Sequence, residues 1–327
     1  CPKHFYMNSI ENLRFSVSAN ADDETVYDVY LPHFERCFAA GAGSVMTAYN
    51  KVNETFCGES KELFDNLKKL GFKGFSISDF LWGVHDGAES LRAGLDIEMP
   101  LTVKRGIRLK TAVKKGKVSE ALLNEHCKNF IATMLRFQNL YREQNYNTSV
   151  ICCSEHTELA RRALESGAVL LKNNGCLPLS NTDTKIALVG RFADEKEIGD
   201  HGSSSVHPPY VVTPYDGLKR IYKNATAART NDIEACLAAT AGADQIIAVL
   251  GNDNIDEGEY IIKTRSGMVK GGDRKSLRLH EDEVKLLREM KKTGKPLTVI
   301  LYSGSALLID EWENEADAIL YAGYPGM

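Results

Sequence analysis

Short apolar runs alternate with helical patterns through residues 1–100, and this alternation constrains the fold more than any other feature of the chain. Four runs have the length and composition of strands: residues 2–5, 44–49, 75–78 and 95–99. The segments between them have helix-like patterns, at about residues 24–40, 60–70 and 82–93. A repeated strand-helix order predicts parallel strands. Four such units are half of a (β/α)8 TIM-type barrel, which normally takes about 250 residues, so we expect the other half to be encoded upstream.

A polar stretch at residues 142–154 separates this region from a second one, and it follows a long helical pattern at about residues 103–141. After a helical pattern at about residues 155–172, strands and helices alternate again. The expected strands are residues 185–190, 245–251, 296–303 and 317–321, with helices at 215–222, 232–240 and 281–292. We therefore predict an α/β chain in three parts: barrel at 1–145, linker at 146–184 and a second α/β domain at 185–327 that is incomplete at its C-terminus.

Composition excludes several classes of function. The 327 residues carry 40 basic and 44 acidic side chains, a formal charge of −4, which gives no electrostatic footprint for nucleic acid or an anionic membrane. No apolar run reaches the roughly 20 residues that a membrane helix needs. The eight cysteines show no C-x-x-C spacing, so a metal cluster is not expected. The partners that remain are small or neutral molecules, and a homo-oligomer is left open.

One carboxylate lies at the end of an apolar strand in the run Gly74-Phe-Ser-Ile-Ser-Asp79-Phe80. Active sites of β/α barrels lie at the carboxyl ends of the strands, so Asp79 is a candidate catalytic residue. A second interpretation is that Asp79 caps the helix that follows near Trp82. Asp96 and Glu98, an i, i+2 pair on one strand face, are rival nucleophiles by geometry alone.

Ordered segments along nearly the whole chain resemble the glycoside hydrolase family 3 β-glucosidases. The matching segments are Lys3-His4-Phe5 with Glu11-Asn-Leu-Arg14, Tyr30-Leu-Pro-His-Phe34, Ser44-Val-Met-Thr-Ala-Tyr-Asn50, Gly71-Phe-Lys-Gly74 with Ser78-Asp79-Phe80, Ala93-Gly-Leu-Asp-Ile-Glu-Met-Pro100, Gly167-Ala-Val-Leu-Leu-Lys172 with Leu177-Pro-Leu179, and Gly272-Asp-Arg274 with Leu277 and Leu279. The resemblance implies a TIM-type barrel followed by an α/β sandwich domain. It also implies a retaining, exo-acting hydrolase that removes terminal β-linked glucose, with oligosaccharides or aglycone glycosides as substrates.

The resemblance implies two catalytic carboxylates. Asp79 corresponds to the nucleophile that forms a covalent glycosyl-enzyme intermediate. The acid/base comes from the segment Asp253-Asn-Ile-Asp-Glu-Gly-Glu-Tyr260, where Glu259 is preferred because relatives carry a Glu-Gly or Gly-Glu-Gly sequence before an aromatic residue. Glu257 stays an alternative, since Glu257-Gly258 fits the same pattern. No cofactor or catalytic metal is implied, because two carboxyl groups and water suffice for this chemistry.

The resemblance also assigns sugar-binding residues. Lys3 and His4 match a pair that binds sugar hydroxyls, and Met46 and Tyr49 match residues that line the same subsite. Arg14 either binds the sugar or braces the barrel through an ion pair with Glu11 or Asp79. The same comparison makes Asp96 and Glu98 structural.

The main departure from the family pattern is Phe80, which stands where relatives usually carry Trp, so that stacking on the sugar is weaker or passes to Trp82. Phe80 therefore leaves the identity of the cleaved sugar open. A β-xylosidase of the same family is one alternative, and a non-catalytic carbohydrate-binding relative is another.

Overall fold

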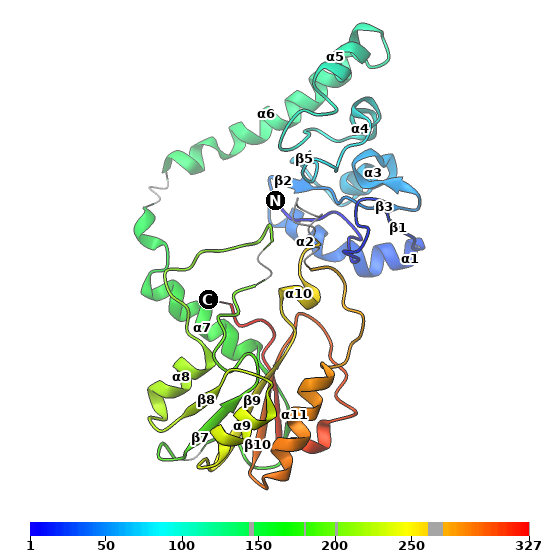
Figure 1. Cartoon of the computed structure of the whole chain (residues 1–327). Helices are drawn as coiled ribbons and strands as arrows, with labels where there is room; N and C mark the ends of the chain where they lie inside the picture. Colours follow the sequence, from blue (N-terminus) through cyan, green and yellow to red (C-terminus); the bar gives the residue numbers. More distant parts are fainter. Residues whose placement is uncertain (144–146, 180, 200–201, 261–270, 327) are drawn as a thin grey trace. The chain divides into compact units, whose positions relative to one another are not determined.

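The computed structural model describes residues 1–143, 147–179, 181–199, 202–260 and 271–326. The chain divides into two compact units, Cys1–Tyr146 and Asn147–Met327, and each has its own hydrophobic core (Figure 1). Each unit is described below by itself. Within the described residues, no helix combines the length and the apolar character that crossing a membrane requires.

Four parallel segments form the centre of the first unit. Strand β2 (Ser44–Met46) pairs in parallel with β5 (Phe75–Ile77). Single parallel bridges extend this pair on both sides, from Phe5 to Thr47 and from Ile77 to Ile97. Helices connect the segments, so this is the consecutive β/α arrangement of the C-terminal half of a TIM-type barrel. The carboxyl ends of all four segments meet at one edge, where Asp79 lies.

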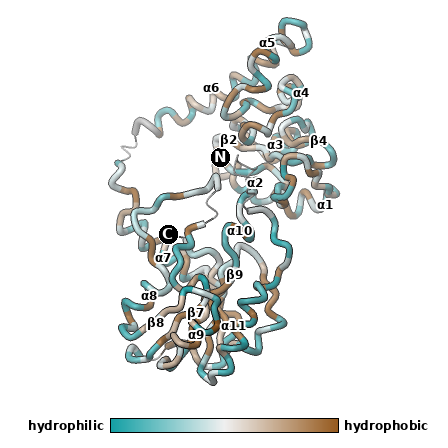
Figure 2. The backbone as a smooth tube through the Cα atoms, viewed as in Figure 1, coloured by the Kyte–Doolittle hydropathy of each residue, from teal (hydrophilic) through white to brown (hydrophobic). Residues whose placement is uncertain are grey.

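The helices of the first unit differ in their bounds from the sequence patterns. They are α1 (Asp23–Thr25), the π-helical η1 (Val26–Tyr30), α2 (Pro32–Ala39), the 3-10 helix η2 (Cys57–Glu59), α3 (Lys61–Lys69), α4 (Gly87–Ala93), α5 (Ile107–Lys114) and α6 (Glu120–Glu143). Pro32 starts a new helix because it lacks the N–H that would continue the preceding one. Gly116, with a φ of 68°, separates α5 from α6. Hydrophilic and hydrophobic segments alternate along α6 (Figure 2).

Aromatic side chains fill the core of the first unit and fix the start of the chain. Phe5 is fully buried and packs edge-on against Phe34, with ring centroids 4.7 Å apart. Its N–H donates to the Met46 carbonyl at 2.8 Å. Burial of Phe5 therefore holds Lys3 and His4 at a defined place beside β2. A small sheet that the sequence patterns did not predict joins β1 (Ser18–Ala19), β3 (Lys51–Val52) and β4 (Thr55–Phe56).

A six-stranded sheet with the order β6-β11-β10-β9-β7-β8 forms the second unit. Its strands are β6 (Val169–Asn173), β7 (Ile186–Val189), β8 (Thr226–Ala228), β9 (Gln245–Gly251), β10 (Leu297–Tyr302) and β11 (Ala318–Tyr321). All pairs are parallel except β6 with β11. Its helices are α7 (Ser154–Gly167), α8 (Pro214–Ile221), α9 (Ile233–Thr240), the short α10 (Asn254–Glu257) and α11 (Glu281–Lys292). Short 3-10 turns, η3 (Thr148–Val150) and η4 (Glu313–Glu315), complete the elements of the described residues.

Strand β9 shows why this unit is an α/β sandwich. All seven of its residues are buried, and alternate side chains belong to two different cores. Ile246, Ala248 and Leu250 pack with α9 and α11 on one face, whereas Ile247 and Val249 pack with the α8 side of the sheet. The continuous apolar run of β9 is what a strand covered by helices on both faces requires.

The segment predicted as a linker, residues 146–184, contains α7 and β6. We expected one helix over residues 155–172, but α7 ends at Gly167. The helix prediction for residues 169–172 is wrong. Val169, Leu170 and Lys172 pair with β11 instead. A short apolar run fits a helix or a strand equally well, and hydrogen bonding to a strand far along the chain decides between them.

Candidate functional site

Asp79 lies two residues beyond β5, at the carboxyl-terminal edge of the parallel strands. Its side chain is 12% exposed. Oδ1 accepts the Phe80 N–H at 2.8 Å, and Oδ2 lies 3.3 Å from His4 Nε2. The turn behind it depends on Gly83, where a Cβ would lie 2.5 Å from the Asp79 carbonyl oxygen. The carboxylate is thus held in a defined orientation and remains accessible.

Helix α4 is capped by Asp86 and not by Asp79. The helix begins at Gly87, and Asp86 Oδ1 accepts the N–H groups of Ala88 at 2.8 Å and Glu89 at 3.0 Å. The capping interpretation of Asp79 is therefore wrong, because another aspartate in the same connection satisfies the helix terminus.

His4 is the nearest ionisable neighbour of Asp79. Burial lowers the pKa of the His4 imidazole below its ordinary value of 6.5, against the opposing effect of the Asp79 carboxylate. The cations Lys3 and Arg14 lower it further, while Glu11 raises it. The contact of 3.3 Å places His4 Nε2 directly beside Asp79 Oδ2. The exposed Lys3 and the largely buried Arg14 thus act on the imidazole that faces Asp79.

Arg14 is fixed by a carboxylate and by two aromatic faces. Its guanidinium lies 3.2 Å from Glu11 and stacks 4.9 Å from the Phe15 ring centroid and 5.2 Å from that of Tyr49. The ion pair with Glu11 corresponds to one of the two roles expected for Arg14. Phe15 is a residue that sequence reasoning missed, and its position directly after Arg14 in the family-like segment was the available signal.

Aromatic side chains surround the Asp79 edge. Tyr49 is buried, and its hydroxyl donates to the Phe80 carbonyl at 2.8 Å. Burial, with the nearby Asp79 carboxylate second, raises the pKa of Tyr49. Phe15 packs between Tyr49 and Trp82, with ring centroids 4.8 and 5.2 Å away. Phe80 and Trp82 stay 44% and 48% exposed, so both can contact a ligand. Met46, at the end of β2, is 9% exposed.

Asp96 and Glu98 are used by the barrel itself. Asp96 accepts from the Ser76 N–H at 2.7 Å and the Ser76 hydroxyl at 3.0 Å, and it lies 2.7 Å from His126 Nδ1. Glu98 accepts the backbone N–H groups of Lys104 and Arg105 at 2.8 and 2.7 Å. These bonds join the strand to neighbouring elements and leave Asp79 as the candidate nucleophile of this edge.

In the second unit, Glu257 is held by several donors. Its Oε2 lies 2.8 Å from Arg274 Nε. Its Oε1 accepts from the Ser303 hydroxyl at 3.3 Å, the Gly304 N–H at 2.5 Å and the Tyr324 hydroxyl. Burial, followed by this bond to Glu257, raises the pKa of Tyr324. These bonds tie the Glu257 carboxylate to Arg274 and to the loop at residues 303–304.

Both carboxylate oxygens of Glu259 contact Ser203. Oε1 accepts from the Ser203 hydroxyl at 2.8 Å, and Oε2 accepts from the Ser203 N–H. Gly202 allows this approach, since a Cβ there would lie 2.5 Å from Glu259 Oε2. Ser203 therefore orients the Glu259 carboxylate through both of its oxygens.

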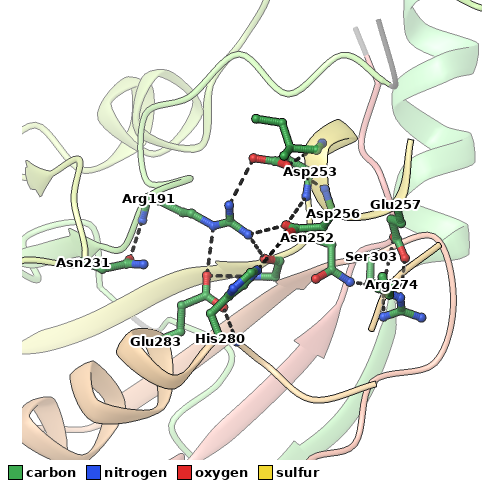
Figure 3. A network of polar contacts seen from close by, with 12 residues as sticks. Arg191, Asn231, Asn252, Asp253, Asp256, Glu257, Arg274, His280, Glu283 and Ser303 are labelled. Atoms are coloured by element: carbon green, nitrogen blue, oxygen red, sulfur yellow. Dashed lines mark hydrogen bonds and ion pairs between the residues drawn. The ribbon is translucent and has the colours of Figure 1, made fainter. Parts of the chain in front are cut away.

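The segment before Glu259 is anchored by Arg191, which sequence reasoning also missed (Figure 3). Arg191 lies two residues beyond β7 and forms ion pairs with Asp253, Asp256 and Glu283. A charged residue at the end of a buried strand was the available signal, the same one that pointed to Asp79. Within the described part of the chain, no group of three or more His, Cys, Asp or Glu side chains has the arrangement of a metal site.

Two family models match the chain in sequence order. Residues 2–132 match the glycosyl hydrolase family 3 N terminal domain, and residues 168–327 match the glycosyl hydrolase family 3 C-terminal domain. The chain is 28% identical to the probable β-glucosidase of Arthroderma benhamiae, over 100% of this chain and 47% of that protein. It is 33% identical to a β-glucosidase of Rhizobium radiobacter, over 69% of this chain and 28% of that protein.

Solved structures agree with these matches. The chain superposes on β-glucosidase D2-BGL of Chaetomella raphigera with a TM-score of 0.85 and 26% identity, over 99% of this chain and 50% of that one. It superposes on a Listeria innocua β-glucosidase in complex with glucose with a TM-score of 0.81 and 27% identity, over 99% and 47%. The chain spans about half the length of the curated relatives it matches.

Proposed function

This chain belongs to glycoside hydrolase family 3, and we propose that the protein is a retaining, exo-acting β-glucosidase in which Asp79 is the nucleophile and Glu259 the acid/base. The observation that carries the proposal is Asp79 at the carboxyl-terminal edge of the barrel strands, 12% exposed and oriented by His4 and the Phe80 N–H. The β-glucosidase relatives and the glucose complex of the Listeria innocua enzyme support glucose as the sugar.

In the first step, an Asp79 carboxylate oxygen attacks the anomeric carbon while the bond to the leaving oxygen breaks. The Glu259 carboxyl group gives its proton to that oxygen. In the second step, water attacks the anomeric carbon, Glu259 takes a proton from the water and the ester bond to Asp79 breaks. Two inversions at the same carbon give net retention of configuration.

The polar residues at the Asp79 edge fit sugar binding. Lys3 and His4 supply donors for sugar hydroxyls, and His4 lies 3.3 Å from Asp79. Met46 and Tyr49 supply the wall of the subsite. Because Phe80 and Trp82 are about half exposed, we propose that both stack on the substrate, with Trp82 supported by Phe15.

The stereochemistry of hydrolysis tests this proposal. Protein expressed from its complete coding sequence is mixed with 4-nitrophenyl β-glucoside, and the first product is observed by proton NMR before mutarotation. We expect β-glucose as the first anomer. Initial α-glucose would contradict a retaining mechanism. A higher kcat/KM on the matching β-xyloside would favour a β-xylosidase, and binding without turnover would favour a carbohydrate-binding relative.

A further inference from the structure

Arg191 lies at a junction of three elements in the second unit (Figure 3). It follows β7 and the positive-φ residue Gly190, whose φ is 101°. Its Nη1 lies 3.1 Å from Asp253, its Nη2 2.8 Å from Asp256 and its Nε 3.2 Å from Glu283. Nη2 also donates to the Gly251 carbonyl. One guanidinium therefore joins the end of β9, the helix α10 and the helix α11.

The contacts of Arg191 act on the segment that leads to Glu259. Asp253 is the N-cap of α10, because its Oδ1 accepts the N–H groups of Ile255 at 2.7 Å and Asp256 at 3.2 Å. Asp256 Oδ1 also lies 3.0 Å from His280 Nε2. Arg191 thus holds α10 by its cap and its first turn.

A second arginine holds the other end of α10. Glu257, the last residue of the helix, pairs with Arg274, which also donates to Ser303 at 3.4 Å and to the Ala306 carbonyl at 3.1 Å. Gly258 then approaches the Asn254 carbonyl so closely that a Cβ would lie 2.3 Å from that oxygen. Glu259 is the next residue, so its backbone leaves a short helix that is fixed at both ends.

We propose that Arg191 is a positioning residue that sets the place of Glu259 through α10, without touching the substrate. This role rests on the proposed function, since it requires Glu259 to be the acid/base. The sheet has other sources of stability: β9 pairs in register with both β7 and β10, and α11 buries Val284, Leu286, Leu287 and Met290. The ion pairs of Arg191 and Arg274 therefore fix α10 and the residues that follow it, rather than the sheet.

The three carboxylates around Arg191 are costly to hold together. Glu283 is fully buried, and burial raises the pKa of its carboxyl group even though Arg191 opposes the shift. Burial lowers the pKa of Arg191, but Glu283, Asp256 and Asp253 outweigh it and raise the pKa overall. Packed apolar side chains could join the same elements at lower cost. The planar arginine guanidinium, however, carries several N–H donors, so it fixes the orientation of its carboxylate partners as well as their distance.

The test compares substrates that differ in their need for acid catalysis. Departure of 2,4-dinitrophenolate needs no proton, whereas departure of methanol does, so misplacing Glu259 should affect methyl β-glucoside selectively. Arg191→Met alone removes the arginine that pairs with the buried Glu283 carboxylate. The double variant Arg191→Met with Glu283→Gln is therefore made in the protein from the complete coding sequence. We expect kcat/KM to fall about 10- to 100-fold on the methyl glucoside and less than about 3-fold on the dinitrophenyl glucoside. Arg191→Lys should give an intermediate loss.

The matched control is Lys291→Met. Lys291 pairs with Asp317 at 3.1 Å and ties the opposite end of α11 to the start of β11. It should change kcat/KM equally little on both substrates. Equal losses on both substrates in the Arg191 variants, or no loss, would overturn the positioning role. Glu259→Gln is the reference: if it lacks the selective loss, the acid/base assignment fails and the positioning role fails with it. If it shows the loss and the Arg191 variants do not, only the positioning role is wrong.

Discussion

Asp79 in the first unit and Glu257 in the second are buried to the same extent, with side chains 12% and 13% exposed, and each follows a strand of a parallel sheet. Their partners differ. Asp79 accepts one backbone N–H and faces a histidine, whereas Glu257 accepts from a serine, a tyrosine and a backbone N–H and pairs with an arginine. Burial alone therefore does not distinguish the two carboxylates. They differ in the donors that they accept from, and we propose that this difference separates a nucleophile from a residue that anchors a loop.

The largest effect should come from Asp79→Ala, which removes the proposed nucleophile. We expect kcat on 4-nitrophenyl β-glucoside to fall about 10⁴-fold or more, while the affinity for a glucose-like inhibitor in calorimetry changes little. Asp86→Ala is the control in the same connection: losing the α4 cap should cost about 1 kcal/mol of stability and leave turnover intact. Undiminished turnover by Asp79→Ala would end the assignment.

The two glutamates of the second unit should separate activity from stability. Glu259→Gln should lower kcat/KM on methyl β-glucoside by about 10²- to 10⁴-fold, with little change in the urea midpoint. Glu257→Gln weakens the bonds to Arg274 and Gly304, so it should cost about 1–3 kcal/mol in the free energy of unfolding. The dependence of kcat/KM on the leaving group should be the same in Glu257→Gln as in the unmodified enzyme. The reverse pattern would move the acid/base role to Glu257.

The smallest effect concerns His4 and pH. Because burial lowers the pKa of His4 from 6.5, the unfolded chain binds the proton more readily than the folded one. The free energy of unfolding should therefore fall as pH drops through 6.5 toward the lower pKa of the folded state, and this part of the change should end below it. Asp79, Lys3, Arg14 and Glu11 face the imidazole and set the size of the shift.

Urea unfolding at several pH values, for the unmodified protein and His4→Gln, measures this contribution. The unmodified protein should lose stability relative to the variant on acidification. A difference that is constant or grows in the opposite direction would show that His4 is not held neutral by burial beside Asp79.

Local sequence patterns predicted that Asp79 lies just beyond a parallel strand, because β5 is a short apolar run that ends two residues before it. The same patterns failed where distant contacts decide. Residues 169–172 become a strand only because β11 offers hydrogen bonds, and Arg191 meets Glu283 from 92 residues away. Helix α4 starts at Gly87 and not near Trp82, since Gly83 folds the intervening turn against the Asp79 backbone. No local pattern contains such contacts.

Trapping the intermediate tests the central claim most directly. The protein from the complete coding sequence is incubated with 2,4-dinitrophenyl 2-deoxy-2-fluoro-β-glucoside, digested and analysed by mass spectrometry. We predict a single fluoroglucosyl label on Asp79, with loss of activity in proportion to labelling. A label on Asp96 or Glu98, or no label on folded protein that hydrolyses β-glucosides, would contradict the assignment of Asp79 as the nucleophile.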